Sequence, residues 1–297
     1  MAAEKVEEFY GPRVANGRAQ FVVRDDRGGR YVSYLRYTAI GLIMVNRQWP
    51  WVLADRTHYD MYIGVDVLHN TAAFTFFSEG GRRCHLHTVD SQQKEKLLRK
   101  QVRTMILDEL SSSLQGAARP PRSIILRRDG RAFISEWMGF KDAIETLIRE
   151  GLLPADMVFG VVEVHKTSAE GCRLVEDSYG QPLRNPSIGS WAYTDQKEGI
   201  VCTTGFPFPM KGTVMPIAVR IAAGDLDLEK ILEDTFRMSQ LCWPVPDRCM
   251  RLSVDLKLCD DYLRSVAGAA DDDEGQFGED DDGAIGSDMR AAAGWGG

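Results

Sequence analysis

The sequence has 297 residues, 44% of them apolar, which suffices for one large domain or two smaller ones with an ordinary core. No stretch of about 18 uncharged apolar residues occurs, and the N-terminus is acidic, so we expect a cytosolic protein without a membrane span or signal peptide. The formal net charge of −7 is concentrated in residues 267–297, whose nine acidic residues and one arginine leave about +1 for the rest.

The cysteines and histidines predict no metal site. Six cysteines are scattered without a CxxC pair, so we expect buried free thiols: Cys84, Cys172, Cys202, Cys242, Cys249 and Cys259. His85 and His87 are two residues apart and would share one face of a strand. No cysteine or carboxylate cluster lies near them in the sequence, so we expect ordinary structural histidines.

The first half of the chain predicts three strands followed by a helix. Residues 62–67, 72–77 and 84–88 read as strands joined by short connections, which favours an antiparallel meander. A helix is expected from near Ser91, because Leu98, Val102, Met105, Ile106 and Leu110 form one apolar stripe.

The second half alternates strands and helices. After Pro120-Pro121 we expect strands at 122–126, 157–164, 189–193, 200–204 and 214–221, and helices around Phe140–Ile148, at 228–241 and at 255–264. Residues 267–297 contain few bulky apolar residues and are expected to be disordered, as a solubility device or an intramolecular mimic of nucleic acid. This order predicts a mixed α/β, RNase H-like fold with a five-stranded type of sheet and flanking helices.

Two aspartates stand out as candidates for chemistry. Asp66 is flanked by Val65 and Val67 inside a predicted strand, where an unpaired carboxylate is costly to bury. Asp129 ends a strand in an Asp-Gly turn, at the edge where open α/β sheets build their sites. A strand-end cap for Asp66 and a plain turn for Asp129 are the alternatives. Carboxylates that converge can hold the two metal ions of phosphodiester hydrolysis, about 3.5–4 Å apart.

From about residue 20 to 264, the sequence resembles the PIWI domain of Argonaute proteins, particularly prokaryotic ones. The resemblance depends on the order and spacing of short segments: Pro50-Trp51-Val52-Leu53, Ile63-Gly64-Val65-Asp66, Arg128-Asp129-Gly130, Val162-Glu163-Val164-His165-Lys166, Asn185-Pro186-Ser187-Ile188-Gly189, Lys211-Gly212-Thr213-Val214-Met215-Pro216-Ile217 and Val254-Asp255-Leu256-Lys257-Leu258-Cys259-Asp260.

The resemblance implies a catalytic tetrad. Asp66 matches its first position, Asp129 its third and Asp260 its fourth, with Asp261 as a one-residue alternative. The glutamate would be Glu95, with Glu79 as the alternative. Asp66, Asp129 and Asp260 would hold two Mg²⁺ or Mn²⁺ ions, with Asp66 bridging both, and Glu95 would order a water.

The resemblance also implies nucleic-acid contacts and a domain division. Residues 1–57 would be a partial MID-like segment, 58–266 the PIWI domain and 267–297 an acidic tail. The residues expected to bind the guide or target strand are Gln20, Arg47, Lys94, Lys96, Arg128, Arg131 and Lys211. The family's helix lysine before the Pro-Trp pair is missing here, and Arg47 stands nearby.

The expected function is that of a guide-directed, metal-dependent endonuclease domain with a place in host defence. Its partners would be guide and target strands of DNA or RNA, with a second chain as a source of the missing N, PAZ and MID parts. One alternative is a catalytically silent module that binds guide and target and acts with a partner. An unguided RNase H-like nuclease or recombinase is the other, which the Asn185 and Gly212 segments oppose.

Overall fold

The computed structural model describes residues 35–36, 38–43, 46, 48–91, 96–115, 119–166, 173–177, 180, 182–208, 212–241 and 250–270. Contacts divide the chain into two units, Met1–Pro50 with Trp243–Val245, and Trp51–Cys242 with Pro246–Gly297. In the first unit, residues 35–36 and 38–43 are helical. The assignment of residues 1–57 to a partial MID-like segment stays a prediction.

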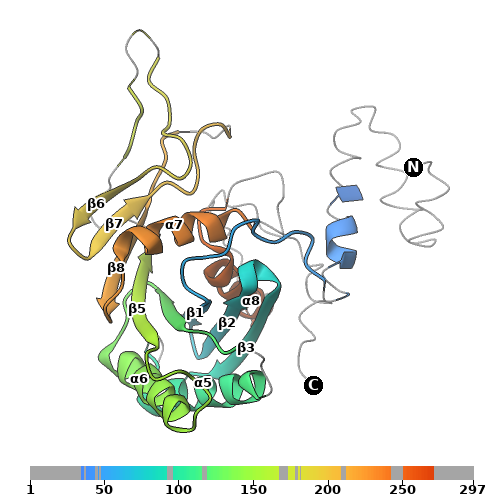
Figure 1. Ribbon diagram of the computed structural model, residues 1–297. Helices are drawn as coiled ribbons and strands as arrows, with labels where there is room; N and C mark the ends of the chain where they lie inside the picture. Colours follow the sequence, from blue (N-terminus) through green and yellow to red (C-terminus); the bar gives the residue numbers. More distant parts are fainter. Residues whose placement is uncertain are drawn as a thin grey trace, which may run out of the picture. The chain divides into compact units, whose positions relative to one another are not determined.

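The second unit is built on one eight-stranded sheet with the strand order β3-β2-β1-β4-β5-β8-β7-β6 (Figure 1). The strands are β1 (Met61–Leu68), β2 (Thr71–Ser78), β3 (Arg83–Asp90), β4 (Ser123–Asp129), β5 (Val158–His165), β6 (Trp191–Asp195), β7 (Glu198–Val201) and β8 (Ile217–Ala223). β1, β2 and β3 form an antiparallel meander, and β4 and β5 run parallel to β1. These five strands form the expected RNase H-like unit, and β8, β7 and β6 extend it in antiparallel pairing.

Helices cover both faces of this sheet. They are α5 (Arg99–Leu114), α6 (Ile134–Arg149), α7 (Leu228–Ser239) and α8 (Val254–Ala270), and a short 3₁₀ turn, η2 (Glu79–Gly81), joins β2 to β3. α5 and α6 pack together beneath the five-stranded unit, and α8 lies against β1 and β2 (Figure 1). No helix among the residues described above is long and apolar enough to cross a membrane.

The alternation of side chains along β1 separates a structural face from a functional one. Ile63, Val65 and Val67 are buried in the apolar core shared with α5 and α6. Gly64 and Asp66 point to the other face because successive side chains of a strand alternate. There α8 packs Cys259 and Leu263 against the sheet.

The elements expected from the sequence are present, with two differences at helix ends. The helix expected from Ser91 begins only at Arg99, after residues 96–98 that are not helical. The last helix continues through residues 267–270, where three alanines favour helix, so the prediction of disorder from residue 267 is wrong for these four. Residues 271–297 lie outside the described part. Cys84, Cys202 and Cys259 are buried free thiols, as expected.

Candidate active site

Two of the expected acids lie at one edge of the sheet because β1 and β4 run parallel. Val65 pairs with Arg128, so Asp66 lies beside Asp129, the last residue of β4. Gly130 then turns the chain at a φ of +81°, which glycine adopts without strain. The Asp-Gly turn expected from the sequence therefore ends β4 at this edge.

The third acid comes from α8, which lies unusually close to β1. A Cβ atom on Gly64 would lie 2.8 Å from the backbone carbon and oxygen of Asp255, so only glycine permits this approach. Leu256 and Cys259 are fully buried against the sheet. Asp260, the residue after Cys259, is thereby turned toward the edge of the sheet.

The three carboxylates converge on one point. Asp66, Asp129 and Asp260 each offer an oxygen, and these atoms all lie within 4.8 Å of one another. Their side chains are 15%, 11% and 9% exposed, so the cluster is at the surface but largely shielded from water. Burial, and after it the charge of Asp129, raises the pKa of Asp66. The expectation that these side chains meet is confirmed, and their role as metal ligands stays a prediction.

Lys166 lies between two of the carboxylates, a role that was not predicted from the sequence. Its Nζ atom is 2.9 Å from Asp129 Oδ2 and 2.7 Å from Asp260 Oδ1. Burial lowers the pKa of Lys166, but the charges of Asp129 and Asp260 more than offset this, and the pKa is raised overall. The residue follows the end of β5 on the same face as Val164, and β5 adjoins β4. That strand order is the signal that could have placed it here.

Comparison with solved structures gives the fold at this point. One match is a structure of Clostridium butyricum Argonaute bound to a guide DNA and a 19-mer target DNA, with a TM-score of 0.67 and 19% sequence identity. The matched region covers 82% of the present chain. The fold is that of a PIWI-type domain. The chain spans only 31% of that Argonaute, and neither a protein-family model nor a curated protein matches its sequence.

The glutamate expected for a PIWI-type site is not among the described residues. Glu95 falls in the segment 92–95, outside the described part. Its alternative, Glu79, lies in η2, and the adjoining Ser78 pairs with Met61 at the far end of β1. That position is five residues from Asp66, about 16 Å along the strand at about 3.3 Å per residue. The alternative Glu79 is therefore wrong.

The one-residue alternative for the last acid is also wrong. Asp261 pairs with Lys257 on its own helix at 2.9 Å, and it is not part of the carboxylate cluster. Burial raises its pKa. Asp260 is the aspartate that α8 brings to the edge.

Two arginines before Asp129 are buried, although the sequence suggested a phosphate-binding surface. Arg128 is 4% exposed and lies 3.5 Å from Asp66 and 3.7 Å from Glu136. The prediction that Arg128 contacts a guide or target strand is contradicted by this burial, and the side chain instead lies beside the Asp66 carboxylate. Arg127 is fully buried and lies 3.4 Å from Asp255 of α8. Consecutive residues of a central strand point to opposite covered faces, which explains both.

Two other expected strand-binding residues meet around one aromatic ring. Lys96 Nζ lies 5.9 Å and Arg131 Cζ 6.0 Å from the centre of the Phe133 ring. Arg131 is exposed and follows Asp129 by two residues in the chain. Lys96 and Arg131 therefore remain candidates for phosphate contacts. Gln20, Arg47, Lys94 and Lys211 lie outside the described residues.

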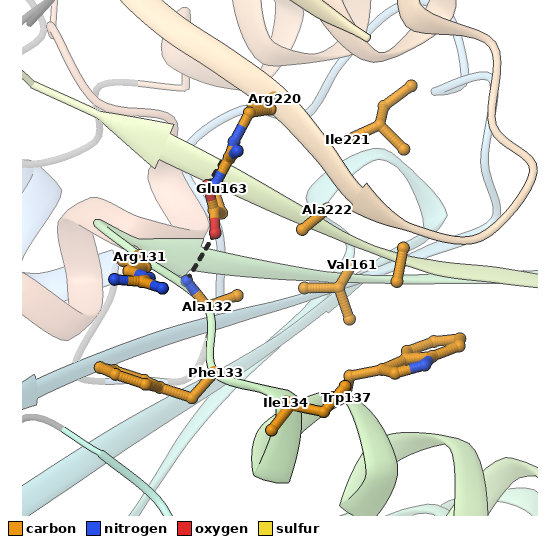
Figure 2. A pocket seen from close by; sticks show the side chains of 11 residues that line it. Arg131, Ala132, Phe133, Ile134, Trp137, Val161, Glu163, Arg220, Ile221 and Ala222 are labelled. Atoms are coloured by element: carbon orange, nitrogen blue, oxygen red, sulfur yellow. Dashed lines mark hydrogen bonds and ion pairs between the residues drawn. The ribbon is translucent and has the colours of Figure 1, made fainter.

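A pocket of about 260 Å³ opens next to this ring, on the face of the sheet that α6 covers (Figure 2). Glu163 of β5 lies at its wall, where it accepts hydrogen bonds from the Ala132 amide and the Arg220 guanidinium. Burial raises the pKa of Glu163, but hydrogen bonds from His165, Ala132 and Arg220 lower it to about 2. This acid is satisfied by its partners and is separate from the carboxylate cluster.

Proposed function

We propose that this chain is the cleavage domain of a nucleic-acid-guided endonuclease, which hydrolyses a target strand paired to a guide with two divalent metal ions. The observation that carries this proposal is the meeting of Asp66, Asp129 and Asp260 within 4.8 Å at the carboxyl edge of parallel strands. Ligand sites of open α/β sheets lie at this edge.

The donor set fits Mg²⁺ or Mn²⁺. All three side chains offer carboxylate oxygens, the hard ligands that these ions prefer. Burial, and after it the charge of Asp129, raises the pKa of Asp66, and a bound cation would favour its ionised form. Asp66, Asp129 and Asp260 would hold the ions, which supply Lewis acidity for phosphodiester hydrolysis. Glu95 remains the proposed fourth acid.

The surroundings of the cluster support a polyanionic substrate. Arg131 is exposed two residues after Asp129 in the chain, and Lys96 and Arg131 lie on the same aromatic ring, that of Phe133. Contacts of this kind reach phosphates and carry no sequence information, which the guide would supply by base pairing. The Argonaute of similar fold holds a guide DNA and a target DNA. We extend this to guide and target strands here, of DNA or RNA, with a second chain to supply parts absent from this one.

A catalytically silent guide-binding module is the second candidate, and one observation favours it. Lys166 lies within 3 Å of both Asp129 and Asp260, where it neutralises charge that a divalent ion would otherwise neutralise. Its side chain is 32% exposed and flexible, so displacement toward water is sterically open. Cleavage requires that displacement, whereas silent binding does not.

The test incubates the protein with a 5′-phosphorylated guide, a labelled complementary strand and Mn²⁺. We expect one cut opposite the guide, reduced at least about 100-fold in Asp66→Ala and Asp260→Asn. Asp261→Asn is the matched control, because it changes the neighbouring aspartate outside the cluster and should still cut. Guide-dependent binding without cleavage would favour the silent module, and equal cleavage by wild type and Asp66→Ala would reject the site.

A further inference from the structure

A second group of metal-ligating side chains lies on β3, the edge strand of the sheet (Figure 1). His85 and His87 are two residues apart and point to the same face, with ring centres 5.6 Å apart. Phe76 of β2 stacks on His85 and meets His87 edge-on. This packing on a buried ring holds both imidazoles beside each other.

A carboxylate from α5 completes the group. Glu109 Oε1 lies 2.6 Å from His85 Nε2, and Oε2 lies 2.9 Å from His87 Nε2. Glu109 lies more than twenty residues from the histidines in the sequence, and only the packing of α5 brings it to them. The expectation that the histidines are structural stays a prediction. Among the described residues, one ligand atom from each of the three lies within 4.8 Å of the others.

We propose that His85, His87 and Glu109 form a binding site for a transition-metal ion of the Zn²⁺ class. Two imidazole nitrogens and one carboxylate oxygen are a ligand set that suits Zn²⁺ and leaves a position for water. Donors around a tetrahedral zinc ion lie about 3.3 Å apart, so small side-chain rotations suffice to close this cluster. The two histidines are 35% and 42% exposed, which gives an ion access from solvent.

This site is independent of the carboxylate cluster. His87 pairs with Phe74, and Phe74 pairs with Val65, whose side chain points into the core under α5 and α6. Asp66 points to the opposite face of the same strand. The two groups also differ in chemistry, because imidazole nitrogens favour zinc-like ions and carboxylate oxygens favour Mg²⁺ or Mn²⁺.

An ion here would tie the edge strand to the helix beneath it. Within the described sheet, β3 pairs with β2 alone, and an edge strand of this kind presents unpaired backbone groups on its outer side. Without an ion, Glu109 still contacts both histidines and holds them beside α5.

The experiment titrates the metal-stripped full-length protein with Zn²⁺ by calorimetry and with Co²⁺ by visible absorption. We expect saturable binding of one equivalent at this site, a rise in Tm of about 5–10 °C at a Zn²⁺ concentration 100-fold above Kd, and affinity reduced at least about tenfold in Glu109→Gln and in His87→Gln. Glu109→Gln keeps size and a hydrogen-bonding oxygen, and circular dichroism confirms that each variant is folded.

Two controls separate this site from the rest of the molecule. His58→Gln removes a histidine that also contacts a carboxylate, Glu233 at 2.6 Å, but that belongs to no group of three metal-ligating side chains in the described part of the chain. Asp66→Asn combined with Asp129→Asn removes the other cluster. Both should bind Zn²⁺ as wild type does. The proposal would be overturned if the wild type showed no saturable Zn²⁺ binding, or if Glu109→Gln bound Zn²⁺ as tightly as the wild type. The three side chains would then form only a hydrogen-bonded contact between β3 and α5.

Discussion

Replacing Lys166 with methionine removes the ammonium group that lies between two of the clustered acids while keeping an unbranched side chain that is one atom shorter. The Lys166 Nζ atom lies 2.9 Å from Asp129 and 2.7 Å from Asp260, so each electrostatic attraction amounts to about 6 kcal/mol at an effective dielectric constant of about 20. Desolvation of the ammonium cancels most of this. We expect a net loss of about 1–3 kcal/mol in the free energy of unfolding and a fall in Tm of about 2–10 °C without divalent ions.

Mn²⁺ should have a larger effect on this variant than on wild type. In wild type an ion must displace the ammonium, whereas in Lys166→Met the carboxylates have lost that cation. A difference of about 1.4 kcal/mol corresponds to about tenfold, so we expect the apparent Kd for Mn²⁺ to fall about tenfold or more. Thermal shift over a series of Mn²⁺ concentrations measures both quantities.

Lys257→Met is the matched control for this experiment. Lys257 pairs with Asp261 at 2.9 Å on α8, next to the cluster but outside it. Its loss should lower Tm slightly and leave the response to Mn²⁺ unchanged. An equal response to Mn²⁺ in wild type and Lys166→Met would refute the reasoning, because the ammonium would then not compete with the ion.

Three further changes test the structure around the site. Glu163→Gln should lower the free energy of unfolding by about 3 kcal/mol near neutral pH, because the pKa of Glu163 drops from 4.5 to about 2 on folding. Denaturation at several pH values should show that the difference in stability from wild type disappears as the pH falls from about 4.5 to about 2. Arg127→Met and Asp255→Leu should each lower the free energy of unfolding by about 3–5 kcal/mol, because each leaves a fully buried charge without its partner. In urea denaturation, the double variant should lose less stability than the sum of the two single losses. Gly64→Ala should cost about 1–3 kcal/mol and reduce the Mn²⁺ thermal shift, because it displaces the helix that carries Asp260.

Each of these has an outcome that contradicts it. A gap between Glu163→Gln and wild type that does not depend on pH would mean that the carboxylate is not held ionised by its partners. If the stability losses of the two single variants were strictly additive in the double variant, Arg127 and Asp255 would not interact. For Gly64→Ala the control is Gly41→Ala, where an added Cβ meets no atom within 4 Å, and equal Tm values in the two variants would contradict the close packing of α8.

The positions of the acids could be predicted because local patterns determine them. Asp66 interrupts an apolar run of alternating side chains, and Asp129 ends a strand at an Asp-Gly turn, so both signals lie within a few residues. Asp260 is expected only from the resemblance, and it follows Cys259, a buried residue of the last helix. Each signal depends on the period of one element, which the sequence records directly.

Other features depend on contacts between elements, which no local pattern records. α5 begins late because Glu136 of α6 accepts the Leu97 amide and Ser135 donates to the Leu97 carbonyl, which holds this residue outside the helix. The histidines of β3 acquire their carboxylate only when α5 packs beneath the sheet. Arg128 looked like a surface cation, but its strand is central and its side chain is covered.

The balance of charge at the carboxylate cluster gives a further argument for metal dependence. Three carboxylates meet there, and their nearest cations are Lys166, Arg128 and Arg264, the last 3.2 Å from Asp260. Acids and cations are thus about equal in number before any substrate arrives. A phosphate that approaches the acids adds negative charge, which this arrangement cannot offset because Arg128 is buried and already paired. We therefore expect a phosphodiester to reach the acids only together with additional cations, and oxygen ligands of this kind favour divalent ions for that role.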